Sequence, residues 1–87
     1  MRNRAYRAVP VNRLDVPRLL QGRDGVAVTA GIDTGKFELL AVCRWADGRF
    51  ERPWRARNPG DIPALLAVLC QLAAGRTLVV AMESSGT

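Results

Sequence analysis

Histidine is absent from this 87-residue chain, and cysteine occurs only at positions 43 and 70. Without histidine, the chain cannot form a Ser-His or Cys-His nucleophile pair, or a metal site with histidine ligands. Cys43 and Cys70 lie in separate apolar segments without metal-ligand spacing, so we expect two buried free thiols in a reducing compartment. Any metal bound here is therefore expected to be a hard cation held by oxygen atoms.

Long hydrophobic runs are also missing, because no segment approaches the roughly 20 apolar residues of a membrane-spanning helix. The longest apolar stretch, from Ile62 to Leu72, is interrupted by Pro63 and Gln71. No apolar segment with a small-residue cleavage site follows the arginine-rich N-terminus, which argues against a secretory signal. We therefore expect no membrane partner and a cytoplasmic protein with one domain and a modest core.

Lysine is nearly absent too. Lys36 is the single lysine among 13 basic residues, which outnumber 8 acidic residues and leave a net charge of +5. A basic surface favours binding to a polyanion, most simply a nucleic acid. The almost exclusive use of arginine is equally compatible with a GC-rich coding bias, so the charge alone leaves both interpretations open.

The chain divides into two parts by composition. Residues 1–25 are rich in arginine, and Pro10 and Pro17 interrupt any helix there. We expect this segment to be a poorly ordered basic arm without a fold of its own. Residues 26–87 carry the periodic apolar pattern, so we expect them to form the folded part.

Three strands are predicted at the start of this folded part. Val26 to Asp33 has two largely apolar faces, which is typical of a central strand. Phe37 to Trp45 is the second strand, followed by a hairpin turn at Ala46-Asp47-Gly48. Arg49 to Arg57 returns, and Pro53 predicts an edge position because proline donates no ladder hydrogen bond. The residues expected to face the core are Val26, Val28, Ala30, Ile32, Phe37, Leu39, Ala41, Cys43, Trp45, Phe50, Trp54 and Ala56.

A helix and a last strand complete the predicted order. Asp61 is expected to cap a helix that begins at Ile62, and Gly75 is expected to end it. Thr77 to Glu83 then forms a short apolar strand, which the crossover helix places parallel to the first. The predicted fold class is α/β, with an antiparallel three-strand meander, a crossover helix and a fourth strand. The apolar stripe of the helix is expected to comprise Ile62, Leu65, Leu66, Leu69 and Ala73, which recur at helical spacing.

This topology brings two carboxylates to one edge of the sheet, because Asp33 ends the first strand and Glu83 ends the fourth. Paired acids without histidine suggest Mg²⁺ or Mn²⁺, which activate a water or hydroxyl and stabilise the leaving oxygen of a phosphodiester. Taken singly, Asp33 is also a common turn residue and Glu83 a solvated strand end; their shared edge favours a site. Gly31 and Gly35 flank Asp33 and are expected to permit a sharp turn and close ligand approach.

Two segments around these acids resemble one protein family. Gly31-Ile32-Asp33-Thr34-Gly35-Lys36 and the segment from Val79 to Thr87 resemble the N-terminal part of the DEDD transposases of bacterial insertion sequences. The stretch from Trp45 to Gly60 is similar to that family as well. These transposases are related to the Piv-type DNA invertases, and their catalytic domain has the ribonuclease H-like fold of the Holliday-junction resolvases. The resemblance covers about Val26 to Thr87.

The resemblance implies an enzyme that uses Mg²⁺ or Mn²⁺ to cleave and transfer DNA strands. Asp33 and Glu83 correspond to the first two acids of the DEDD tetrad, as catalytic and metal-binding residues. The last two aspartates and the family's strand-exchange serine have no counterpart here, so we expect the front portion of a transposase, inactive alone. The implied partners are DNA and, in the intact family member, a guide RNA and other transposase subunits, in the bacterial nucleoid.

Two other functions stay open at this point. Gly31 to Gly35 also resembles the phosphate-binding turn of the sugar kinase, actin and heat-shock ATPase superfamily. Alternatively, the chain is a small basic nucleic-acid-binding module whose aromatic residues stack on bases, although their alternation favours core packing. A solvated strand face explains the arginines as well as phosphate contacts do. The residues expected to contact nucleic acid are Lys36, Arg49, Arg55 and Arg57, with Arg52 on the same returning strand.

Overall fold

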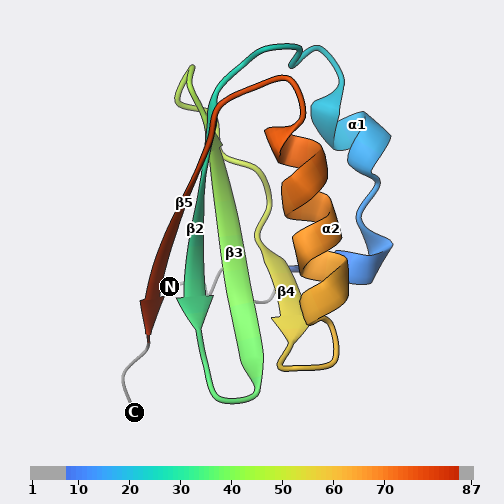
Figure 1. Ribbon diagram of the computed structural model, residues 1–87, viewed down its shortest axis with the longest axis vertical. Helices are drawn as coiled ribbons and strands as arrows, with labels where there is room; N and C mark the ends of the chain where they lie inside the picture. The colour runs from blue at the N-terminus through green and yellow to red at the C-terminus, as the bar shows by residue number, and fades with distance from the viewer. Residues whose placement is uncertain (1–7, 85–87) are drawn as a thin grey trace.

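The computed structural model describes residues 8–84 and has two layers, a sheet and the helices that cover one of its faces (Figure 1). The described strands form one mixed sheet in the order β1-β4-β3-β2-β5. The predicted α/β class is therefore confirmed. In chain order the elements are β1 (Val9–Pro10), the 3₁₀-helix η2 (Val11–Arg13), α1 (Val16–Leu20), β2 (Val28–Thr34), β3 (Glu38–Trp45), β4 (Trp54–Arg57), α2 (Ile62–Ala73) and β5 (Leu78–Ser84).

The three middle strands form the predicted antiparallel meander. β2 pairs with β3, and β3 pairs with β4, both in the antiparallel direction. α2 then carries the chain back across the sheet, so that β5 lies beside β2 and runs parallel to it, as expected. Figure 1 shows the β2 and β5 arrows side by side and pointing the same way. β5 is an outer strand of the described sheet.

The hydrophobic core lies between α2 and one face of the sheet. Trp45 and Trp54 are each 1% exposed, and Leu72 of α2 is fully buried against them in the same cluster. Burial of such large apolar side chains is the dominant favourable contribution to folding. The buried cluster comprises Val11, Val28, Ala30, Ile32, Leu39, Ala41, Cys43, Trp45, Trp54, Ala56, Leu65, Val68 and Leu72.

The buried stripe of α2 differs from the predicted one. Leu65, Val68 and Leu72 are its buried residues, whereas Leu66 is 55% exposed. Ala73 is exposed as well, so the expectation was wrong for both residues. The sequence places leucine or alanine on every side of this helix, so the pattern alone did not select the face that the sheet covers. Gly75 follows the helix with φ of +77°, which confirms its predicted role as the terminating residue.

The N-terminal segment, where the structure describes it, is not the arm that we expected. Val9 and Pro10 form a short parallel strand beside β4, and the Val9 amide donates to the Pro53 carbonyl at 2.8 Å. Val11 is 2% exposed and belongs to the core. The two prolines delimit short elements here, because Pro17 lies in the first turn of α1, where proline is tolerated. Residues 1–7 lie outside the described part.

The returning strand contains a bulge that the alternation pattern did not predict. Arg44 pairs with Phe50, whereas Ala41 pairs with Trp54, so three steps along β3 correspond to four along the returning strand. One extra residue reverses the faces of a strand. Phe50 is consequently 62% exposed, although we expected it in the core. Pro53 lies in this interruption, and β1 covers the outer edge of β4, so the predicted edge position was wrong.

Two further observations concern exposure. Cys43 is buried as expected, but Cys70 is exposed, because it lies on the outer side of α2 with Leu66 and Ala73. Phe37, 73% exposed, was also expected in the core, but it lies just before β3 in the hairpin. Within residues 8–84, no helix is long and apolar enough to cross a membrane.

Candidate metal centre on the open face of the sheet

The sheet has an open face, opposite α2, that no described helix covers (Figure 1). It is formed by the residues of each strand that alternate with the buried ones. In the register of the ladders, neighbouring side chains on this face come from directly paired residues. Its residues are Thr29, Gly31 and Asp33 of β2, Glu38, Leu40, Val42 and Arg44 of β3, Arg55 and Arg57 of β4, Val79, Ala81 and Glu83 of β5, and Phe50.

Asp33 and Glu83 are direct partners in the parallel ladder between β2 and β5. Both residues are exposed on the open face. Two carboxylates that are fifty positions apart in the sequence therefore lie on adjacent strands, next to each other. The backbone ladder sets their spacing, because paired residues of neighbouring strands lie about 5 Å apart. The Thr34 hydroxyl donates to the Glu83 carbonyl at 3.2 Å and adds a link between the two strand ends.

A hollow of about 260 Å³ lies next to this acid pair. Besides the two acids, its lining includes Gly31, Ala81, Leu40 and Val42. Gly31 does not turn the chain as we expected, because it lies inside β2 and its φ is not positive. The missing side chain leaves space beside the carboxylates, and no close contact requires glycine there, because an added Cβ would stand at an ordinary contact distance of 3.9 Å from the Val42 carbonyl.

The electrostatics of the acid pair favour a cation. Neither carboxylate takes part in an ion pair or hydrogen bond within residues 8–84. Two anionic groups held on adjacent strands repel each other, and a cation between them relieves that repulsion. Their oxygen atoms are the donors that Mg²⁺ and Mn²⁺ prefer, so the pair fits such an ion. The described part contains no group of three or more potential metal ligands. Asp33 and Glu83 would therefore supply two ligand side chains to such an ion.

Two other aspartates are engaged in turns. Asp47 accepts from the Arg49 amide and from Arg23 Nη1, each at 2.9 Å, and these contacts lower the pKa of Asp47. Asp61 accepts from the side chain and amide of Arg57, and that guanidinium lowers the pKa of Asp61. Neither carboxylate faces the acid pair, which agrees with the interpretation of both as turn residues.

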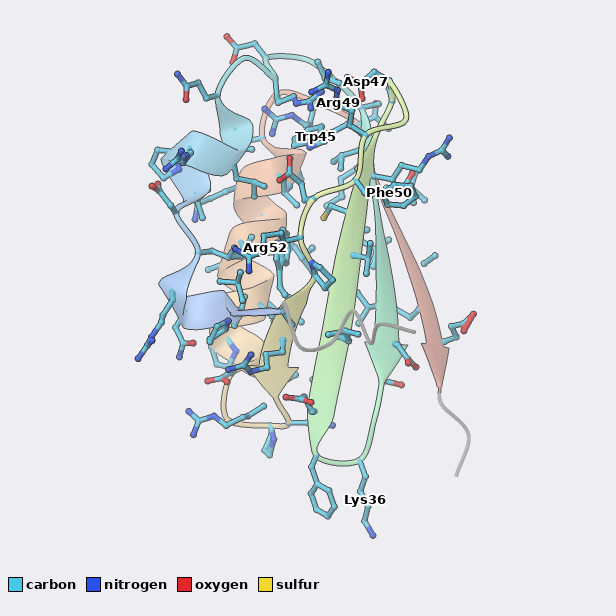
Figure 2. The ribbon with its side chains drawn as sticks, turned by 180° about the vertical axis from the view of Figure 1, so that it is seen from behind. Lys36, Trp45, Asp47, Arg49, Phe50 and Arg52 are labelled. Atoms are coloured by element: carbon cyan, nitrogen blue, oxygen red, sulfur yellow. The ribbon has the colours of Figure 1, made fainter. Side chains whose placement is uncertain are left out.

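The predicted nucleic-acid contacts fall into three places. Lys36 lies in the β2–β3 hairpin at the acid end of the sheet, with its amine 5.4 Å from the Phe37 ring centroid. Arg49 lies at the opposite end, as Figure 2 shows, and Arg52 lies in the bulge. Arg55 and Arg57 share the open face with the acids. The structure therefore brings only Lys36, Arg55 and Arg57 to the region of Asp33 and Glu83.

Sequence patterns did not indicate two features of the structure. Arg13 is brought beside β4 by the pairing of β1, and a two-residue strand leaves no periodic signal. Trp45 donates from Nε1 to the Glu51 carboxylate at 2.7 Å, and the Arg23 guanidinium lies 4.8 Å from the centroid of the Trp45 ring. Glu51 was expected on the outer face, and the bulge that turns it inward depends on the register rather than on local composition.

Comparisons with known proteins add no relative to this description: no family model, curated protein or solved structure matches the chain.

Proposed function

We propose that this chain belongs to a DNA-acting, transposase-type domain with a ribonuclease H-like fold, in which Asp33 and Glu83 hold a Mg²⁺ or Mn²⁺ ion. The observation that carries the proposal is the direct pairing of Asp33 with Glu83 on the open face, where neither carboxylate forms an ion pair with another residue of the described range 8–84. The meander, the crossover helix and the parallel fourth strand support the fold assignment. The net charge of +5 supports a nucleic acid as substrate.

The residues of this chain would perform three tasks in that function. Asp33 and Glu83 would bind the ion through oxygen atoms whose spacing two hydrogen-bonded strands hold constant. Leu40 and Val42 would limit water on one side of the hollow. Gly31 and Ala81 would let a phosphodiester approach the sheet surface closely. A bound divalent ion supplies Lewis-acid activation of a nucleophile and neutralises charge on the phosphate.

The alternative functions receive less support. Stacking of Trp45 and Trp54 on bases is incompatible with their exposures of 1%, which leaves Phe50, 62% exposed on the open face, as the remaining aromatic residue of that alternative. The glycines of the ATPase-like segment do not have a positive φ, and Gly31 lies inside a regular strand. Neither observation favours a second function over DNA strand cleavage and transfer. We place the protein, as part of the same proposal, in the bacterial nucleoid, with a guide RNA and further transposase subunits as partners.

The test is a titration of the whole chain with Mn²⁺, followed by water proton relaxation. We expect Asp33→Asn and Glu83→Gln each to weaken Mn²⁺ binding by at least about tenfold. Both residues are exposed, so both variants should keep the circular dichroism spectrum of the parent. Glu38→Gln is the matched control, because Glu38 is an exposed carboxylate at the start of the neighbouring strand β3.

Unchanged Mn²⁺ affinity in both acid variants would reject the metal site. An equal loss of affinity in Glu38→Gln would also contradict it, since the effect would then reflect overall charge instead of the Asp33–Glu83 pair.

A further inference from the structure

We propose that the open face has a second, metal-independent subsite that binds the phosphate backbone of a nucleic acid, about 10 Å from the acid pair. This inference rests on the proposed nucleic-acid function and adds the path of the strand over the surface. The subsite is a polar hollow of about 490 Å³ on the β4 side of the sheet. Three arginines line it: Arg13, Arg55 and Arg57.

The ladders place this subsite in line with the acids. Glu83 pairs with Asp33, Asp33 with Leu40, and Leu40 with Arg55. These four residues form one row across four neighbouring strands on the same face. Asp33 and Arg55 are two strand spacings apart, or about 10 Å, which corresponds to about three base-pair steps along the axis of B-form DNA. A backbone that lies across the strands can therefore reach both ends of the row.

Internal contacts hold two of the arginines in place. Arg57 directs Nε and Nη2 to the Asp61 carboxylate, at 3.1 and 3.2 Å, while its side chain remains 77% exposed. Arg55 donates from Nη1 to the Ala8 carbonyl at 2.7 Å. A guanidinium has five N–H donors, so both groups keep donors for a phosphate. Because they are already ordered, binding costs less side-chain entropy than it would for free surface arginines.

Two acidic residues of the hollow, Asp61 and Glu38, affect how strongly it can bind a phosphate. The two hydrogen bonds from Arg57 balance the charge of Asp61, and Asn12 Nδ2 also donates to Asp61 at 3.3 Å. Glu38 is only loosely paired, with its carboxylate 4.0 Å from Arg55 Nε and its side chain 56% exposed. Glu38 therefore opposes an anion in the hollow, and its neutralisation should strengthen phosphate binding.

The test measures fluorescence anisotropy of a labelled mixed-sequence DNA oligonucleotide with the whole chain, in EDTA and over a range of salt concentrations. We expect Arg55→Gln to weaken binding about tenfold and to lower the salt slope of log K by about 1. Glu38→Gln should bind more tightly than the parent. Arg49→Gln is the matched control, because it removes the same charge at the far end of the sheet (Figure 2) and should change affinity less than twofold.

Arg57 is left unchanged in this design because its bonds to Asp61 support the turn before α2. Circular dichroism of each variant should match the parent. Equal losses in Arg49→Gln and Arg55→Gln, or no DNA binding by the parent chain, would overturn the subsite. The result is independent of the Mn²⁺ titration, since the metal is absent, so the subsite and the metal centre can fail separately.

Discussion

At the scale of single residues, Asp61 occupies the capping position of α2 but makes different hydrogen bonds from those expected of a helix cap. It precedes α2 as the predicted cap, yet its carboxylate makes no capping bond to the helix. Its oxygens instead accept from the Arg57 amide at 2.8 Å and from the Arg57 guanidinium. Asp61 is only 8% exposed, so these bonds replace the water that a free carboxylate would bind. The residue therefore links the end of β4 to the start of α2.

This link predicts a pH dependence of stability. The Arg57 hydrogen bonds lower the pKa of Asp61 in the folded protein. A lowered folded-state pKa contributes stability that is present above the ordinary aspartate pKa of about 3.9 and is lost as the pH falls through the folded value. We expect urea midpoints to drop below about pH 4, and to drop less steeply in Asp61→Asn, which has no proton to gain.

Arg57→Gln removes the partner and should flatten the same part of the profile, while leaving the buried carboxylate less well satisfied. If Asp61→Asn keeps the slope of the parent between about pH 4 and pH 2, the ion pair does not contribute to acid stability.

At the scale of elements, α2 and the bulge before β4 decide which side chains reach the core. Only one side of α2 packs on the sheet, through Leu65, Val68 and Leu72. The bulge between Phe50 and Trp54 performs the equivalent selection in the returning strand, turning Phe50 outward and Trp54 inward. The first effect depends on where α2 packs against the rest of the fold and the second on the register of the returning strand with β3, so neither follows from the hydrophobicity of the element itself.

The packed side of α2 can be tested with one matched pair of substitutions. Leu72→Ala removes methyl groups from a fully buried position and should destabilise the fold by about 2–5 kcal/mol. Leu66→Ala makes the same chemical change on a 55% exposed position and should alter stability by about 0.5 kcal/mol or less. Urea unfolding followed by tryptophan fluorescence measures both. Similar losses for the two variants would show that the helix packs with a different face.

At the scale of the whole molecule, the two layers separate stability from the candidate site. The helices cover one face of the sheet (Figure 1). The strand registers place the acid pair and the arginines of β4 on the other face. Trp45, Trp54 and Leu72 hold the covered face together without contributing to the hollow at Asp33 and Glu83. Substitutions on the open face should consequently affect binding more than folding.

The two cysteines offer a measure of global opening. Burial, with a further contribution from the negative charge of Glu51, raises the pKa of the Cys43 thiol to about 12. Cys43 is fully buried in the central strand β3, whereas Cys70 is exposed. The reactive species is the thiolate. At about pH 8 an aromatic disulfide reagent should therefore label the exposed Cys70 within seconds and the buried Cys43 slowly.

Cys70→Ser should abolish the fast phase, and urea should accelerate the slow phase in parallel with unfolding. Fast labelling of Cys43 in native Cys70→Ser protein would contradict the closed two-layer core.

The amino-acid sequence by itself determined the order of the elements and the place of the acids. Alternating apolar residues predicted β2 and β3, and Gly75 predicted the end of α2, because period-two patterns and a positive φ are local properties. The crossover rule then predicted that Asp33 and Glu83 would lie together, which the parallel ladder confirms as a matter of position. Their roles remain proposals.

Only the tertiary structure decided which faces of α2 and of the returning strand are buried, and which residues lie beside the acids. The exposure of Phe50 depends on one extra residue in a ladder, and the burial of Leu72 in place of Leu66 depends on where the sheet meets the helix. Arg13 reaches the hollow near Arg55 through a two-residue strand. These outcomes result from contacts between segments far apart in the chain, and no local pattern of residues encodes them.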